Sequence, residues 1–511
     1  MSDHSSSPPP PDLPLFTIGT GSPAMTAVAP NHFLALPRPN TLLGHALPVG
    51  VPDTSTLAAH DFDVDTRTGF LPPQVPLTRL PVRWERWEEI LDDAGRRRLQ
   101  LGDKVGISAA EQESSATWRA SISSLPVLPI DDLEKSEYLL RRAHHVLSFI
   151  LHLFIHSLPP SAPILIPAPL TIPLLQVSAE LHLPPTNNYT DNVLYNWKHK
   201  VAPHSSEALP TLDNLACQTL FSNTPDEEAF YLASTRIELR GVEALELMRS
   251  SMDELFHSDT LAERRVTSYL QTMATVIREL RTLLLSVREG CNPDIFYNQI
   301  RPWFKGADSD PSGRPWVFEG LEDHPELAEP IELSGPSAGQ SPLVHALDVF
   351  LGVDRYSHTS TSTGARASTT ASAHAAEGNS RAAFLERMQI YMSRHHRTFL
   401  RHLSQNQRPL RDFVERSKNT GLLEAYNECV KALKEFRDSH MIVVALYIIG
   451  PAKKAREQTE ARARAAQETQ GAAADAHALK GTGGTNLVKF LKGVRDRTAG
   501  ALFTDVHGRA F

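Results

Sequence analysis

A single histidine interrupts the apolar face of a long helix-forming stretch near the C-terminus, residues 422–450. Apolar side chains recur there at three- or four-residue spacing, so one face of a helix carries them all. The residues on this face are Leu422, Tyr426, Cys429, Leu433, Phe436, His440, Val444 and Tyr447. A buried imidazole needs a partner, because an unpaired buried polar group costs about 1–3 kcal/mol. The spacing therefore predicts that His440 is either a hydrogen-bonded core residue or a metal ligand.

Two other segments offer groups that could bind an organic ligand. In Phe296–Trp303, FYNQIRPW, an arginine stands among aromatic residues. Arg301 could clamp a carboxylate through two parallel hydrogen bonds, although a surface arginine beside core aromatic residues is the simpler explanation. The small residues of Gly335–Ser341, GPSAGQS, would let a flat ligand approach the backbone. A plain turn and helix N-cap explain them equally well.

A glycine-rich segment, Lys480–Thr485 (KGTGGT), precedes the last helix-forming stretch. Its backbone N–H groups could form an anion-binding nest at the start of that helix. It is not a Walker A loop, because the lysine precedes the glycines instead of following them.

Two histidines one helical turn apart, His152 and His156, have the spacing at which two imidazoles share a zinc ion. No glutamate lies between them and no third ligand is evident. We therefore interpret both as core or surface histidines.

Composition narrows the class of protein. The 511 residues are 41% hydrophobic and 22% charged, which is typical of a soluble globular chain with two or three domains. The net charge of −8 gives no electrostatic footprint for nucleic acid or an anionic membrane. Cys217, Cys291 and Cys429 lie too far apart for a disulfide framework or a C-x-x-C motif. No signal peptide or apolar stretch long enough to cross a bilayer is recognisable, so we expect a reducing, cytoplasmic setting.

The sequence predicts a mainly α fold. Residues 1–30 form a Pro/Ser-rich tail expected to be disordered, and residues 31–222 a small, mostly helical N-terminal domain. Residues 223–511 form a large all-α domain, with mobile insertions at about 356–383 and 452–478. One helix is expected over 130–156, capped by Asp131 or Asp132. The helix of His440 should end at Gly450 and Pro451.

Five motifs resemble, in order, those of the indoleamine 2,3-dioxygenase family. They are FYNQIRPWFKG, GPSAGQSP with ALDVFLGV, RMQIYMSRHHRTFL, GLLEAYNECVKAL with FRDSHMIVVALYI, and KGTGGTNLVKFLKGVRDRT. The match covers most of residues 226–498. The family binds heme b and inserts both atoms of O2 across the indole C2–C3 bond of L-tryptophan, giving N-formylkynurenine. The resemblance implies the same activity here, with an electron donor to reduce the ferric heme iron. From the net charge we expect no nucleic-acid or membrane partner, and nothing in the sequence requires more than a monomer.

The resemblance also assigns residues to the heme. His440 becomes the axial ligand to the iron, and Arg437, on the same helix face, pairs with a heme propionate. Asp348 matches an acid that helps to orient Arg437 or His440. Ser337 and Ala338 lie beside the heme.

A second set of residues is implied for the substrate. Phe230 and Phe296 flank the indole ring, and Arg301 binds the substrate carboxylate. Thr482, in the GTGG segment, contacts the amino or carboxylate group and closes the site. Tyr189, Ser234 and Ala338 complete the pocket, with Ser234 as a polar neighbour of O2.

Two other functions stay open. A heme-binding sensor or signalling protein of the same fold, with little turnover, would retain His440. It should have other residues in place of Phe296, Arg301 or the GTGG segment. A helical scaffold without heme would have His440 as a packed core residue. The more conspicuous His396 aligns with a family histidine that does not bind iron.

Overall fold

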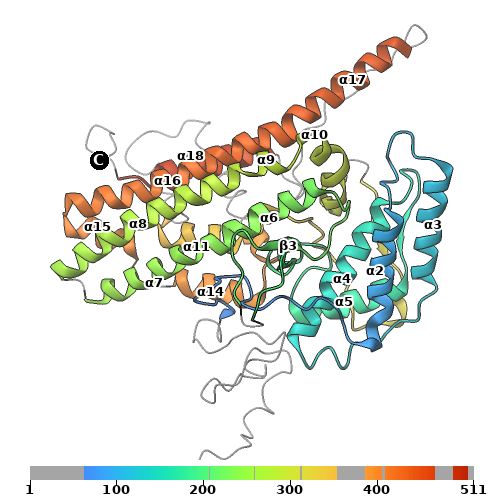
Figure 1. Ribbon diagram of the computed structural model, residues 1–511, viewed down its shortest axis with the longest axis horizontal. Helices are drawn as coiled ribbons and strands as arrows, with labels where there is room; N and C mark the ends of the chain where they lie inside the picture. Colours follow the sequence, from blue (N-terminus) through green and yellow to red (C-terminus); the bar gives the residue numbers. More distant parts are fainter. Residues whose placement is uncertain are drawn as a thin grey trace, which may run out of the picture.

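The computed structural model describes residues 62–205, 208–257, 259–310, 313–353, 386–405, 409–466 and 487–503. Within these ranges the chain is mainly α-helical, as predicted (Figure 1). The N-terminal tail 1–30, the insertion at 356–383 and the segment Lys480–Thr485 lie outside the described residues. The proposed boundary at residue 222 stays a prediction.

Helices from the first part of the chain gather at one end of the molecule (Figure 1). They are α2 (Glu85–Arg97), α3 (Ala109–Ser123), α4 (Glu137–His156) and α5 (Ala168–Leu181). The central helix α4 is buried over most of its circumference, in keeping with its apolar composition. It begins at Glu137, so the predicted start near Ile130 is wrong. Asp132 does not cap it; its carboxylate pairs with Lys135 and Arg83, while residues 131–135 form turns.

Two very short sheets interrupt the helical pattern. Strand β1 (Ile164–Ile166) pairs in parallel with β4 (Trp316–Phe318), and β2 (Trp197–His199) pairs antiparallel with β3 (Leu215–Cys217). Because β4 belongs to residues 223–511, the expectation that this part is all-α is not fully met. A three-residue strand is too short to leave a clear alternating pattern in the sequence.

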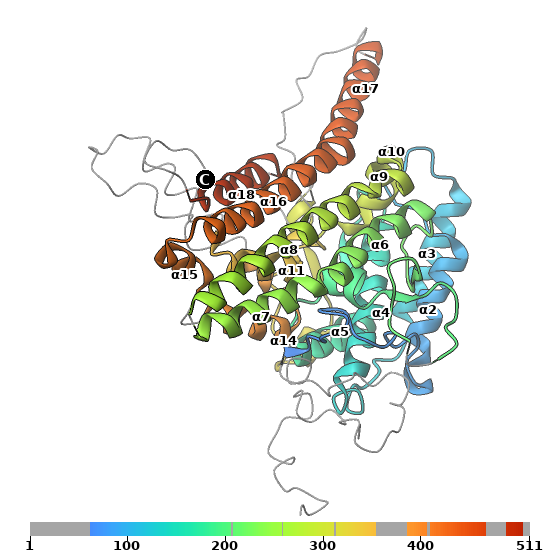
Figure 2. The same ribbon diagram turned by 60° about the vertical axis from the view of Figure 1, so that its left-hand side comes forward.

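The second part of the chain forms a helical bundle around α8 and α16, which pack along each other (Figure 2). Its helices are α6 (Pro225–Arg240), α7 (Val242–His257), α8 (Thr260–Leu285), α9 (Val287–Gly290), α10 (Pro293–Ile295), α11 (Pro342–Phe350), α14 (Arg394–Ser404), α15 (Leu410–Ser417), α16 (Thr420–Val444), α17 (Gly450–Ala466) and α18 (Leu487–Gly500). The short turns used below are η5 (Thr190–Leu194), η6 (Phe296–Ile300), η7 (Arg301–Phe304), η10 (Ala338–Gln340) and η11 (Ala445–Ile449). Helix α18 lies against α16.

The helix of His440 does not end at Gly450. It passes through the π-helical turn η11 into α17, which projects away from the bundle (Figures 1 and 2). Pro451 lacks an N–H group, and the wider π turn just before it accommodates the missing hydrogen bond. The predicted inward face of α16 is confirmed for Leu422, Tyr426, Cys429 and Leu433, which are fully buried. Phe436 and His440, further along the same face, are half-buried.

Candidate active site

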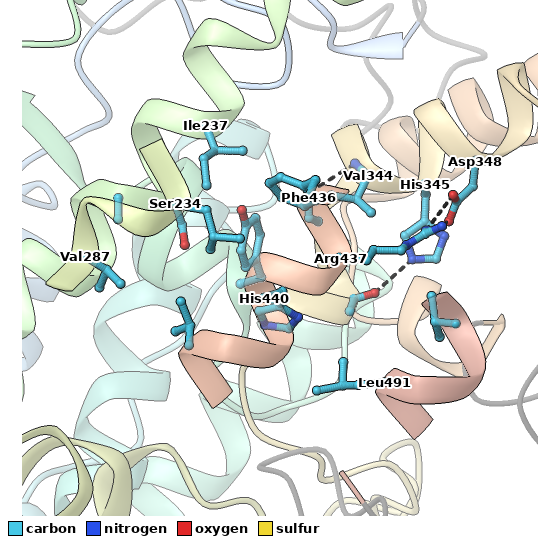
Figure 3. A pocket seen from close by; sticks show the side chains of 18 of the residues that line it. Ser234, Ile237, Val287, Val344, His345, Asp348, Phe436, Arg437, His440 and Leu491 are labelled. Carbon is cyan, nitrogen blue, oxygen red and sulfur yellow. Dashed lines mark hydrogen bonds and ion pairs between the residues drawn. The ribbon is translucent and has the colours of Figure 1, made fainter. Parts of the chain in front are cut away.

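An apolar cavity lies between α6, α11, α16 and α18, with contributions from η10 and the start of η5 (Figure 3). Most of its wall is aliphatic or aromatic. The polar side chains that line it are Tyr189, Ser234, Ser341, His345, Asp348, Arg437 and His440. A largely apolar cavity with a few convergent polar groups is the usual form of a cofactor or substrate site.

His440 projects from α16 into this cavity, and Ser234 enters it from α6 (Figure 3). No ring nitrogen of His440 has a hydrogen-bond partner in the described ranges. Burial, aided by the nearby charge of Arg437, lowers the pKa of His440 to about 4. The imidazole is therefore neutral at neutral pH and keeps a lone pair for a ligand.

Arg437 ties three helices together at the edge of the cavity. Its Nη2 donates to Asp348 Oδ1 and Oδ2 at 2.6 and 2.5 Å, and its Nη1 donates to the hydroxyl of Thr498. Asp348 belongs to α11 and Thr498 to α18, so one guanidinium group joins both helices to α16. Charge-assisted hydrogen bonds on both sides of the guanidinium fix its orientation.

A buried carboxyl group lies behind the wall on the α6 side. Glu238 is fully buried, and it accepts hydrogen bonds from Tyr189 Oη at 2.9 Å and Ser341 Oγ at 2.5 Å. Burial raises the pKa of Glu238 to about 7, against the effect of these two hydrogen bonds. Ser234 also hydrogen-bonds Tyr189. Three cavity hydroxyl groups are thus linked to one titratable carboxyl group.

Sequence reasoning missed Glu238. It lies four residues after Ser234, one helical turn along α6, where the two side chains share a face. A glutamate on a surface helix usually faces solvent. Only its spacing from Ser234 could therefore have indicated that Glu238 belongs to the site.

The aromatic residues predicted for the substrate lie next to one another. Phe230 lines the cavity, and its ring centroid is 4.5 Å from that of Phe296. Phe296 itself lies just behind the wall, where its ring also meets Tyr447 edge-on at 5.7 Å. Phe304 packs within 6.1 Å of Phe230 and closes this aromatic cluster.

Arg301 is not among the lining residues. Its side chain is buried, and its guanidinium lies 5.7 Å from the centroid of the Tyr297 ring. Burial lowers the pKa of Arg301, because the charged form loses water. Ala338 lines the cavity, whereas Ser337 caps η10 by accepting a hydrogen bond from Gly339 N at 3.2 Å. Thr482 lies outside the described residues.

The three other histidines singled out in the sequence, His152, His156 and His396, have protein partners. His152 bonds Trp303 O at 2.7 Å and Thr186 Oγ1 at 2.9 Å, and His156 bonds Lys305 O at 2.8 Å. These contacts support the interpretation of both as core residues. His396 bonds Asp63 O at 3.1 Å and does not line the cavity.

These features define an α-helical protein with an apolar cavity and a neutral histidine directed into it. The chain belongs to the indoleamine 2,3-dioxygenase family, whose pattern it matches over residues 58–501. An indoleamine 2,3-dioxygenase of Saccharomyces cerevisiae is 32% identical over 448 residues, covering 84% of this chain and 90% of the yeast protein. Indoleamine 2,3-dioxygenase 2 of Mus musculus is also 32% identical, with 86% and 94% covered. A 6-hydroxytryptophan 2,3-dioxygenase of Fusarium equiseti is 29% identical, with 85% and 95% covered.

Among the residues with a described position, no helix combines the length and apolar character needed to cross a membrane.

Proposed function

We propose that the protein is a heme-dependent dioxygenase that converts L-tryptophan and O2 into N-formylkynurenine. The observation that carries this proposal is His440, a neutral imidazole with no protein partner in the described ranges, directed into an apolar cavity. The family membership supplies the reaction class. An external electron donor is needed to keep the iron reduced.

The residues present fit a heme b group. An imidazole that lines an apolar cavity without a hydrogen bond leaves its polar nitrogens poorly solvated, and an iron ion would satisfy its lone pair. Arg437, held by Asp348, is placed at the edge of the cavity, where it would pair with a propionate. The apolar side chains of Phe436 and Val344 in the wall would help to hold the porphyrin. When bound, the heme supplies the redox chemistry that activates O2.

The chain's own residues would bind and orient the indole. Phe230, with Phe296 packed behind it, offers an aromatic wall that fixes the ring plane. Ser234 and Tyr189 supply hydroxyl groups on the α6 side, and Ala338 leaves room for the ring. The largely apolar wall would limit the access of water to the reacting atoms.

We retain Arg301 and Thr482 as proposed partners of the substrate's carboxylate and amino groups. Arg301 follows directly on η6, whose Phe296 packs against Phe230 of the cavity wall, although its own guanidinium does not line the cavity. Arginine suits a carboxylate because its planar fork matches the two oxygens.

The test is product formation by the full chain under reducing conditions. Heme-loaded protein is incubated with L-tryptophan and O2, and N-formylkynurenine is measured by mass spectrometry. The proposal predicts product from the wild type and a rate lowered roughly a hundredfold in Arg301→Ala, since a buried charged contact is lost. Heme-loaded wild-type protein that yields no product would favour the sensor function. Because one relative acts on 6-hydroxytryptophan by name, this compound is assayed in parallel.

A further inference from the structure

A second cavity of about 580 Å³ lies beside the first, between α11, α14 and α18. The two cavities share His345, Asp348, Arg437 and Val494 as a common wall. The second one differs in character, because arginine side chains from α14, α16 and α18 line it. Its volume is in the range of small-molecule sites.

Two arginines on α14 face this cavity without a carboxylate partner among the described residues. Arg397 and Arg401 lie one helical turn apart, and neither forms an ion pair with any acid that the structure describes. The guanidinium of Arg397 donates only to backbone carbonyls, those of Ile390 and His182, each at 3.0 Å. Like charges at this spacing repel each other, so the two arginines destabilise α14 while the cavity holds no anion. Burial and then Arg401 itself lower the pKa of Arg397.

The acids of the cavity do not neutralise this pair. Both carboxylate oxygens of Asp348 already accept hydrogen bonds from Arg437. Glu386 lines the cavity from an exposed position and has no ion pair with either arginine. His345 adds no charge, since burial lowers its pKa. The wall formed by α14 therefore carries an excess of positive charge held in place by the fold.

We propose that this cavity is a second ligand site, which binds a small oxyanion with phosphate or carboxylate groups between Arg397 and Arg401. Charge-assisted hydrogen bonds from two guanidinium groups are the usual means of holding such groups. The site is distinct from the one proposed for the heme, because Arg397 and Arg401 do not line the first cavity. Its existence does not depend on the proposed enzymatic function.

Isothermal titration calorimetry on the full chain tests this site. Inorganic phosphate and succinate are titrated, at constant ionic strength, into both heme-free and heme-loaded protein. We expect one anion per chain in both forms. Arg401→Glu should weaken binding at least about tenfold, since it removes one charge-assisted contact and adds repulsion. Arg401 is exposed on α14, so this change leaves the core intact. Comparison of the two anions identifies the preferred chemical group.

Arg264→Glu is the matched control, because Arg264 is an exposed arginine on α8 that does not line the cavity. It should leave the affinity unchanged, and Arg401→Lys should retain most of it. Equal affinity in Arg401→Glu and wild type would mean an adventitious ion only. Binding that disappears when heme is loaded would mean that the anion merely occupies the place of a propionate. Each of these two results, and also the absence of any binding, would overturn the proposal. If heme cannot be loaded, the titration of the heme-free protein still tests the site.

Discussion

Asp348 accepts both of its short hydrogen bonds, 2.6 and 2.5 Å, from the same nitrogen of Arg437, three residues before His440 on α16. The pair forms part of the wall between the two cavities. It fixes the helix that presents His440 relative to α11. The orientation of the imidazole therefore depends on a contact made by a residue from another helix.

Removing Asp348 should destabilise the fold strongly. Asp348→Ala leaves the guanidinium of Arg437 buried and without its carboxylate, which costs about 3–5 kcal/mol. Urea unfolding measures the loss. Asp438→Ala is the control, because Asp438 forms a half-exposed ion pair with Lys434 at 2.7 Å, and its loss should cost less than about 1 kcal/mol. Equal losses in the two variants would show that the Asp348 pair has no special structural role.

Glu238 should make stability depend on pH. Its pKa is about 7 in the folded chain, against ~4.3 for an unfolded glutamate. The folded state therefore holds the proton more tightly, and the stabilisation is present at low pH and is lost as pH rises towards about 7. The free energy of unfolding of the wild type, relative to Glu238→Gln, should fall over this range and level off above it. A difference that rises with pH, or stays flat, would contradict this assignment.

Phe230 should matter for substrate more than for heme. Phe230→Ala opens the aromatic wall and should raise the tryptophan concentration for half-maximal rate roughly tenfold, because a stacking contact is lost. Steady-state kinetics measures this tryptophan concentration. The heme absorbance should stay close to that of the wild type. Phe399→Ala, which removes a ring packed against Phe70 away from the cavity, is the control and should leave the kinetics unchanged. Equal effects of both variants on the half-maximal concentration would argue against substrate contact.

The assignment of the iron ligand can be checked by absorbance. His440→Ala should abolish the Soret band of the reconstituted protein, whereas His396→Ala should retain it, because His396 bonds a backbone carbonyl instead. Imidazole added to His440→Ala should restore part of the band by filling the space left by the side chain. A Soret band that survives in His440→Ala but is lost in His396→Ala would reverse the assignment.

Periodicity in the sequence was enough to place His440 on the inward face of α16, because the apolar positions repeat along the whole helix. It was not enough to find the end of that helix. Gly450 and Pro451 are strong stop signals, yet the π turn η11 lets the helix continue. Local rules also misplaced the start of α4, because Asp132 found charged partners instead of the helix N-terminus.

Contacts between distant segments were the harder part of the site. The sequence left open whether Asp348 orients Arg437 or His440, and the structure shows the pair with Arg437. The hydrogen bond from Tyr189 to Glu238 was not predicted. Arg301 shows the limit most clearly. Its separation from Phe296 in the sequence did not predict which way its side chain points. The guanidinium lies beside the Tyr297 ring and does not line the cavity. Such directions depend on turns of mixed helix type, which residue spacing does not predict.

The central claim is that the cavity of His440 serves the insertion of both oxygen atoms of O2 into the indole ring of tryptophan. Its most direct test is a reaction of reduced, heme-loaded protein with L-tryptophan in doubly labelled O2, with the product weighed by mass spectrometry. The account predicts N-formylkynurenine carrying both heavy oxygen atoms, and no such product from His440→Ala. A product with one labelled atom, or unchanged tryptophan in the presence of a fully reduced heme, would contradict it.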